Sequence, residues 1–596
     1  MHKAFRRVFC ALFSAILLFT CVGSASAGAS SSGEHMTAAA VPVYYAGLYG
    51  EESSELTVYF RDGNTQIPYY DMDTVASVMT KLYRDGYGDY SKDPDYTLTY
   101  TVEGDVVTFS RENGYDMVLD FDENYIYFID YDLFVSHSFD ETVLEFSHST
   151  GFDDDGNPVY LQRCADDSFS RYGDEILIGL DNYSIELIEE DGNFYIPAQT
   201  VADLLLGETY TVFLYNGSAC FYMNYDNFLA DLDDPDSGFT ALYYADGPQE
   251  RSPELIEFTY NELVLKLDLC YGFRESRSIL SFYDYLEEIE YKDGVNLKRL
   301  LMSDDPVDMD IALCVLVRQA FDDLHSAYLA VSPYTGTEKE SEVRQISSGS
   351  SMQQFSEVYS VYLDARCEYF PNGVPGYQEI GNTAYVTFDT FTAPRNTDYY
   401  ASAPTDDSSD DNFGLLIYAN SQIRRENSPI ENVVIDLSCN TGGMEDAAAF
   451  VTAWFLGETS EYFYSSLTGA TAVNSYRCDV NLDHKFDDAD TVSDLNLFCL
   501  ISPVSFSCGN LTPCIFKTSG QVILVGRTSG GGSCIVHPFT TASGSVAQCS
   551  GYKHISSMKN GSFYDSDQGI EPDIVLIRPE SLYDREALTD YLNSLK

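Results

Sequence analysis

The central clue to the architecture is VVIDLSCNTGG at residues 433–443, which has the pattern of a buried strand ending in a glycine turn. A helix-forming run from Met444 to Leu456 follows directly. Buried strands that alternate with helices are typical of an α/β sheet. Glycine tolerates close backbone approach, and amides freed at such a turn can stabilise a developing negative charge. Gly442 and Gly443 are therefore candidate oxyanion-binding residues, although an ordinary strand-to-helix turn would show the same pattern.

A second segment, VSFSCGN at residues 504–510, places Ser507 between an apolar strand end and a helix expected to begin near Gly509. The helix dipole and the free amides of a first turn favour an alkoxide at this place. A serine here is often only a helix cap. Its occurrence after the glycine turn and before another buried strand, VILVG at 522–526, indicates a candidate nucleophile.

Four motifs occur in a fixed order: IDLxxNxGG, the Ser507 turn, VILVG and GIEPD at 569–573. In this order they resemble peptidase family S41, the C-terminal processing proteases, over about residues 253–592. The resemblance implies a ClpP/crotonase-like α/β core and Ser507 as the nucleophile. It also implies an oxyanion hole made by Gly442 or Gly443 together with the amide of Cys508. The best-known branch uses a lysine base, but that position is Gly532 in this chain.

A second branch of the family, which includes the tricorn protease core, uses histidine as the base. FDDLHSAY at 321–328 resembles its L-x-D-x-H-[ST] pattern, so His325 is expected to take the serine proton. The resemblance places an orienting acid near Gly569, and Asp567 is preferred there over Asp565. His537 is the fallback base. These residues imply a serine peptidase that hydrolyses peptide bonds through a Ser507 acyl-enzyme.

An acidic loop at 479–490 has oxygen-bearing residues at the spacing of an EF-hand calcium loop and resembles a dockerin repeat. His484 stands where glycine is usual, and the last ligand is Asp in place of Glu. A solvated acidic loop is the alternative. The peptidase chemistry requires no cofactor, and a structural Ca²⁺ is suggested only by this loop, with the expected ligands Asp479, Asn481, Asp483, Lys485 (through its carbonyl), Asp487 and Asp490.

Residues 1–27 have the features of a secretory signal: basic residues, an apolar run from Val8 to Val22, and Ala25-Ser26-Ala27 as the cleavage site. Lipidation at Cys21 is the alternative. The chain is therefore expected to be secreted or held at the cell surface. Its net charge of -61 disfavours binding to nucleic acid or anionic membranes. Twelve cysteines follow the signal, and the spacing does not distinguish buried thiols from disulfides.

With 596 residues the chain is too long for one core, so we expect a multidomain protein. The expected parts are a linker at 28–40, a β-rich (α+β) module at 41–240, a helical segment at 253–335 and an α/β protease core at 336–596 that contains the acidic loop. Two strand–Pro–helix patterns, after Ile67-Pro68 and Ile196-Pro197, resemble copper amine oxidase N-terminal-like repeats. They imply a stalk or binding module and no copper.

The main rival to a peptidase is a catalytically inactive module with the same fold. The glycine at the lysine position and the uncertain acid are what such a module would show. It would bind peptides or cell-wall material, with the N-terminal repeats as its anchor. A third hypothesis is a calcium-dependent surface adhesin, but it does not explain the Ser507 motifs. The expected partner is a protein or peptide substrate, and the oligomeric state is left open.

Overall fold

The computed structural model describes residues 35–45, 54–85, 97–111, 115–135, 160–164, 171–207, 210–225, 228–230, 238–245, 247, 249–394 and 397–595. The expected signal sequence at 1–27 lies outside the described residues. No described helix is long and apolar enough to cross a membrane. The twelve cysteines in the described part of the chain are all free, and ten of them are buried.

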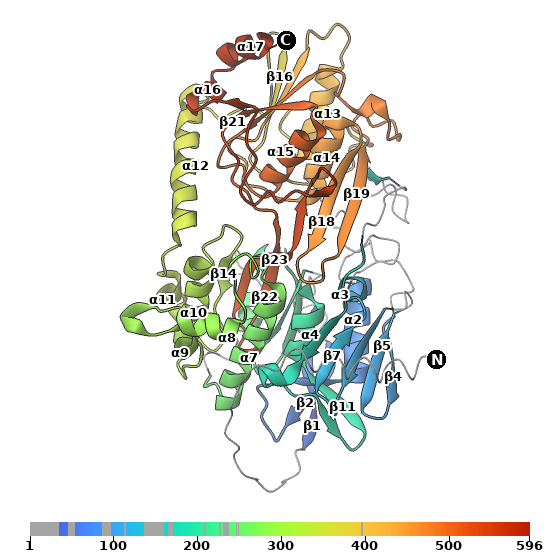
Figure 1. Ribbon diagram of the computed structural model, residues 1–596, viewed down its shortest axis with the longest axis vertical. Coiled ribbons are helices and arrows are strands. Elements are labelled where there is room, and N and C mark those ends of the chain that lie inside the picture. Colours follow the sequence, from blue (N-terminus) through green and yellow to red (C-terminus); the bar gives the residue numbers. More distant parts are fainter. Residues whose placement is uncertain are drawn as a thin grey trace.

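A mainly parallel sheet forms the upper part of the molecule (Figure 1). Its strands, in spatial order, are β15 (Tyr377–Ile380), β16 (Thr383–Thr387), β17 (Asn432–Asp436), β20 (Asn496–Ile501), β21 (Val522–Gly526) and β26 (Ile574–Val575). Only β15 pairs antiparallel within it. The expected α/β core is present, and its central strands are continuous apolar runs because both faces of the sheet are covered.

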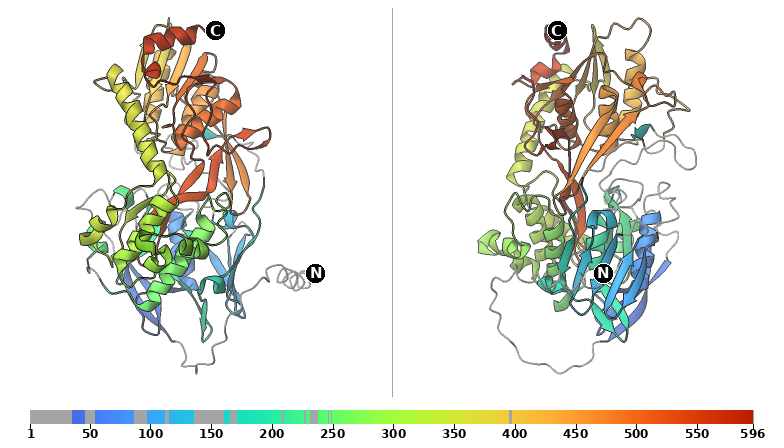
Figure 2. Two further views of the ribbon diagram at one scale, coloured as in Figure 1. Left: turned by 60° about the vertical axis from the view of Figure 1, so that its left-hand side comes forward. Right: turned by 45° about the vertical axis from the view of Figure 1, so that its right-hand side comes forward.

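Helices cover the two faces of this sheet. Val433 and Ile435 pack on one side, with the helices α13 (Asn412–Ile423), α14 (Glu445–Leu456) and α15 (Cys508–Ser519). Val434 packs on the other side, with α12 (Ser350–Tyr369), α16 (Glu580–Tyr583) and α17 (Arg585–Asn593). The long helix α12 runs from the lower helices up along the upper part of the molecule (Figure 2). Both turns predicted to carry chemistry therefore sit on a rigid, two-sided core.

A second, antiparallel sheet joins the upper and lower parts. Its path is β14 (Ala327–Ala330), β23 (Val546–Ser556), β18 (Thr459–Ser465), β19 (Thr471–Cys478) and β8 (Leu161–Arg163), with β22 (Cys534–Thr540) also paired to β23. The strands β22 and β23 extend from the upper part toward the lower helices (Figure 1). Because β8 and β14 come from the expected N-terminal module and helical segment, this sheet crosses the sequence-based boundaries. A small hairpin, β24 (Met558–Lys559) and β25 (Ser562–Phe563), follows β23.

Within the described N-terminal residues there is a seven-stranded sheet, in the order β10 (Ile188–Glu190), β11 (Asn193–Pro197), β3 (Tyr69–Asp71), β2 (Ser54–Arg61), β1 (Met36–Tyr45), β13 (Cys220–Asn224) and β12 (Thr211–Tyr215). The two strand–Pro–helix patterns lie side by side, because β3 pairs with β11 before the chain enters α2 (Met72–Asp85) and α4 (Ala198–Leu205). Since β1 begins at Met36, the linker predicted at 28–40 is wrong over its last residues.

A smaller meander sheet accompanies it, in the order β4 (Thr99–Glu103), β5 (Val106–Ser110), β6 (Asp116–Asp120), β7 (Tyr125–Phe128) and β9 (Ile176–Gly179). The short helices α3 (Tyr131–Val135) and α6 (Gly238–Tyr243) complete the module in its described part. Apolar side chains of both sheets belong to one core with the helices that follow.

The helical segment begins at α7 (Pro253–Cys270), where the Ser252 side chain accepts a hydrogen bond from the Leu255 amide and Pro253 takes the first helical position. The helices α8 (Phe282–Glu288), α9 (Leu297–Leu301) and α10 (Pro306–Val315) follow. A π-helical turn at Leu316–Ala320 ends this run, just before the predicted His325 motif. The helix α11 (Glu340–Arg344) precedes α12.

Candidate active site

Ser507 has a backbone conformation that is rare for a residue with a side chain. Its φ of 56° and ψ of -123° cost on the order of 1–3 kcal/mol and persist only where the surrounding structure enforces them. The Ser507 amide donates to the Gly531 carbonyl at 3.0 Å, which holds the turn. Although Ser507 is the N-cap of α15, its side chain makes no capping hydrogen bond. The hydroxyl is therefore not used as a helix cap.

The glycine turn after β17 lies directly against Ser507. A Cβ added to Gly442 would come 2.6 Å from Ser507 Cβ and 3.1 Å from its Oγ, so only glycine fits there. The Gly442 amide is already engaged, because it donates to Asn440 Oδ1 at 2.9 Å. In the described part of the chain, the amides of Gly443 and Cys508 have no hydrogen-bond acceptor. Gly443 and Cys508 are thus the available oxyanion donors, and Gly442 provides the space.

The Cys508 thiol is engaged in the structure and is not an alternative nucleophile to Ser507. Its Sγ donates to the Gly443 carbonyl at 3.1 Å, which ties the two proposed oxyanion residues together. Burial and the nearby carboxylate of Glu461 raise the pKa of Cys508 to about 12, so the thiol stays protonated. Burial and the same Glu461 also raise the pKa of Glu445, at the start of α14, well above its usual value.

His325 is buried next to the Ser507 turn. Its ring packs on Phe506, the residue before Ser507, with 4.6 Å between the ring centroids. The His325 carbonyl accepts from Gln548 Nε2 at 2.6 Å, which fixes the residue to strand β23. Burial lowers the pKa of His325 to about 4, and the charge of Asp323 opposes this shift. The imidazole is therefore neutral at pH 7, the form that can accept a proton.

Gly532, where the resemblance would place a lysine, has no room for any side chain. Its φ is 92°, and a Cβ there would come 2.5 Å from the Phe506 ring. That ring instead fills the space between Gly532 and His325. Phe355 of α12 packs on the other part of the same ring, with 6.2 Å between the centroids. The side chain of Phe506 thus occupies the volume next to Gly532 that a lysine would need.

Asp567 does not face His325, contrary to the prediction. One carboxylate oxygen accepts from the Ser533 amide at 2.6 Å, and the other lies 3.9 Å from Nδ1 of His554. The carboxylate whose charge opposes the pKa shift of His325 is Asp323, and its oxygens accept hydrogen bonds from Ser326. Asp565, the alternative acid, accepts from the Asp567 amide at 3.0 Å. The local motif could not reveal the contact with His554, because His554 lies in β23 and meets Asp567 only through the segment that follows this strand.

The fallback base His537 is also placed elsewhere. It lies in β22 with its ring against Gly207 of the N-terminal module, where an added Cβ would come 2.3 Å from the imidazole. Its Nε2 is buried without a hydrogen-bond partner. Burial lowers its pKa well below the usual value. His537 therefore belongs to the contact between the two parts of the molecule and not to the Ser507 turn.

The acidic loop at 479–490 folds around its own backbone amides. Asp479 accepts from the amides of Asp483 and His484, and Asp490 accepts from those of Val480, Asn481 and Asp487. The loop does have the left-handed turn of an EF-hand at its sixth position, where His484 has a φ of 62°. Two other expected ligands are engaged locally: Asp483 pairs with the Lys485 ammonium at 2.7 Å, and Asp487 caps a short 3-10 turn.

A buried neutral imidazole, a strained serine at a helix start and two free amides are the kinds of group that serine-dependent acyl transfer uses. In agreement with this, residues 382–576 match the model of peptidase family S41, a serine-type peptidase family. The match confirms the family resemblance over that part of the chain. No curated protein matches the sequence.

Several solved structures are similar at low identity. The photosystem II D1 C-terminal processing protease is 17% identical, with a TM-score of 0.25, over 35% of this chain and 46% of that one. This chain therefore spans less than half of that protease. A lipoprotein from Streptococcus agalactiae is 16% identical (TM-score 0.31) over 55% of this chain and 97% of its own. Mature CPAF, in complex with lactacystin, is 13% identical (TM-score 0.25) over 36% and 50%.

Proposed function

We propose that the protein is a secreted serine peptidase that hydrolyses peptide bonds through an acyl-enzyme on Ser507, with His325 as the general base. The observation that carries the proposal is the Ser507 turn. Its backbone is strained, the Ser507 hydroxyl makes no helix-capping hydrogen bond, and the amides of Gly443 and Cys508 have no acceptor among the residues that the structure describes. A capping serine would need none of this strain. Strained backbone of this kind is concentrated at functional sites.

The proposed reaction uses these groups in the following order. The Ser507 hydroxyl gives its proton to the His325 imidazole while its oxygen attacks the peptide carbonyl. The amides of Gly443 and Cys508 stabilise the oxyanion of the tetrahedral intermediate. The imidazolium then protonates the leaving amine, and water releases the acyl group by the same steps in reverse. Burial keeps the resting His325 imidazole neutral, which is the form that the first proton transfer requires.

A fluorophosphonate probe tests the proposal, because it labels only an activated serine. The full-length protein, Ser507→Ala and His325→Ala should be compared by intact mass, with His537→Ala as a matched control for loss of a buried histidine. We expect labelling of the wild type and of His537→Ala, and none of the other two variants. A wild type that takes up no label would rule out the mechanism.

A second candidate function is peptide binding without catalysis. It is favoured by two observations: Gly532 leaves no space for a lysine, and Asp567 faces His554 in place of His325. An unlabelled wild type that still binds unfolded polypeptide would support this alternative. The export signal at 1–27 fits either function, and N-terminal sequencing of the mature protein would distinguish cleavage after Ala27 from lipidation at Cys21.

A further inference from the structure

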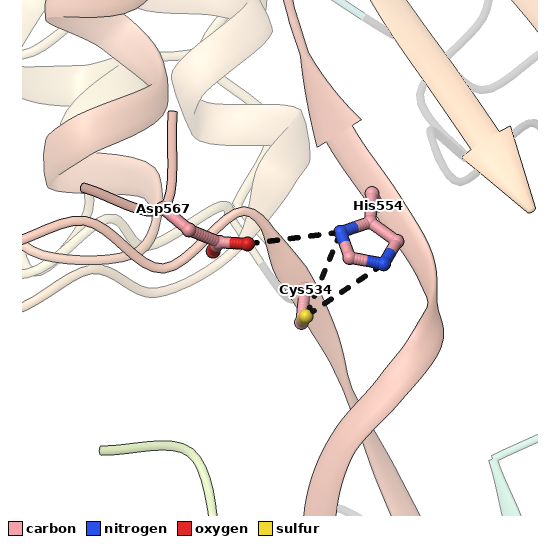
Figure 3. Close-up of side chains that lie close together, drawn as sticks. All are labelled: Cys534, His554 and Asp567. Carbon is pink, nitrogen blue, oxygen red and sulfur yellow. Dashed lines mark hydrogen bonds and ion pairs between the residues drawn. The ribbon is translucent and has the colours of Figure 1, made fainter. Parts of the chain in front are cut away.

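Three side chains of types that commonly bind metals lie close together: Cys534 from β22, His554 from β23 and Asp567 from the turn before GIEPD (Figure 3). Cys534 and His554 are cross-strand partners in the β22–β23 pair. Among the described residues this is the one group of three or more Cys, His, Asp or Glu side chains whose ligand atoms lie within 4.8 Å of one another.

The spacing of these atoms is close to that of a tetrahedral site. Cys534 Sγ lies 3.6 Å from His554 Nδ1, and the same nitrogen lies 3.9 Å from Asp567 Oδ2. Zn–S bonds of about 2.3 Å and Zn–N or Zn–O bonds of about 2.0 Å at tetrahedral angles put sulfur and nitrogen about 3.5 Å apart, and nitrogen and oxygen about 3.3 Å apart. Binding would therefore require the nitrogen–oxygen pair to close by about 0.6 Å, and the sulfur–oxygen pair starts within 4.8 Å.

The charges and the burial also suit a divalent ion. The Cys534 and His554 side chains are buried, and that of Asp567 is 12% exposed. A thiolate and a carboxylate together carry two negative charges, which a dication would neutralise where water cannot. Thiolate, imidazole and carboxylate are the ligands that Zn²⁺ accepts, and three of them leave a fourth position open. The Ser533 hydroxyl lies 3.2 Å from His554 Nδ1, a hydrogen bond that a metal on this nitrogen would replace.

We propose that Cys534, His554 and Asp567 bind a transition-metal dication of the Zn²⁺ type, which holds the glycine-rich turn at 529–533 in place. Binding displaces the thiol proton of Cys534 to solvent and forms S–metal, N–metal and O–metal bonds. The metal joins two strands to the Asp567 turn. That turn supports the proposed nucleophile, because the Asp567 backbone packs against Gly531. The Gly531 carbonyl in turn accepts a hydrogen bond from the Ser507 amide.

Cobalt titration of the chelator-treated full-length protein tests the site, because Co²⁺ bound to a thiolate shows a charge-transfer absorbance that oxygen ligands do not give. The acidic loop at 479–490 therefore cannot produce the signal. We expect one equivalent of Co²⁺ to produce the band in the wild type and Zn²⁺ to abolish it. Cys534→Ser should lack the band, whereas Cys367→Ser, which removes an exposed cysteine outside the cluster, should keep it.

Two further variants keep the test decisive if Cys534→Ser folds poorly, which circular dichroism would show. Asp567→Asn should keep the band but require more Co²⁺ to reach it, and His554→Gln should also weaken binding, in contrast to His537→Gln. The proposal is overturned by a wild type without the band, by a band that survives in Cys534→Ser, or by unchanged affinity in Asp567→Asn. None of these readouts depends on peptidase activity, so the outcome is separate from that of the probe experiment.

Discussion

At Ser507 the backbone, and not only the hydroxyl, distinguishes the residue. Its positive φ is a conformation in which glycine carries no steric cost. The sequence pointed to Ser507 and to the glycine turn, because strand, turn and helix follow one another locally. It left open which glycine donates to an oxyanion. That depends on Asn440, whose side chain takes the Gly442 amide and leaves the Gly443 amide free.

The strained conformation predicts an unusual order of stability. Ser507→Gly should be more stable to urea than Ser507→Ala, by about 1 kcal/mol, because glycine relieves the backbone strain that alanine keeps. Both variants should be inactive toward the probe. Ser421, exposed in the helix α13, is the matched control, and there alanine should be the more stable by about 1 kcal/mol. The same order at both positions would contradict the strain at Ser507.

The low pKa of His325 predicts the pH dependence of activity. The labelling rate of Ser507 should rise with pH through about 4 and then stay level to neutral pH, since the base is already deprotonated. The pKa of His325 in the folded state lies below the usual 6.5. The contribution of His325 to the free energy of unfolding therefore decreases as the pH falls from 6.5 to 4. A rate that rises instead through pH 6 to 7 would contradict a buried base. Denaturation of His325→Asn should show a weaker loss of stability over the same range.

The turn that carries Gly532 packs tightly against the Ser507 turn. Adding even a methyl group at Gly532 should therefore destabilise the protein. Gly532→Ala should lower the free energy of unfolding by about 1–3 kcal/mol more than Gly561→Ala. Both glycines have positive φ, at 92° and 82°, but an added Cβ contacts the Phe506 ring only at Gly532. Urea denaturation of the two variants measures the difference. Equal losses would show that Phe506 moves aside freely.

The acidic loop gives a prediction for calcium. Ca²⁺, but not the same concentration of Mg²⁺, should raise the melting temperature, because the EF-hand spacing and the left-handed sixth position suit the larger ion. Asp483→Ala should abolish the shift. Asp488→Ala, an exposed acid of the same loop at a position without a ligand role, should retain it. If Ca²⁺ does not shift the melting temperature of the wild type, the alternative hypothesis of a solvated acidic loop is correct.

At the scale of elements, the parallel strands were predictable because each is a continuous apolar run followed by a turn and a helix. The antiparallel sheet was not. Its strands β8, β14 and β23 are hundreds of residues apart, and no local pattern specifies their pairing. The same limit explains the misplaced acid, since Asp567 meets His554 only through the turn that follows β23. The EF-hand spacing, in contrast, is local, and His484 at its sixth position adopts the left-handed conformation even though the sequence has no glycine there.

Across the whole molecule, the N-terminal module contacts the strand that positions the base. The Tyr225 hydroxyl donates to Gln548, whose amide donates to the His325 carbonyl. Tyr225→Phe should therefore slow probe labelling by about tenfold, the effect of one net hydrogen bond. Tyr210→Phe is the control, because the Tyr210 hydroxyl donates to the Val536 carbonyl at the same junction without reaching His325. Equal rates in both variants would contradict this coupling.

The pairing of β23 with β14 and β18 also sets an order of assembly. A chain made from its N-terminus contains His325 long before residues 546–556, the strand that holds this histidine against the rest of the site. The serine turn is likewise completed only by Gly531, which follows Ser507 in the chain. A nascent polypeptide that has not yet reached residue 556 thus has no assembled Ser507–His325 site, and any activity of the proposed site can arise only after that strand has emerged.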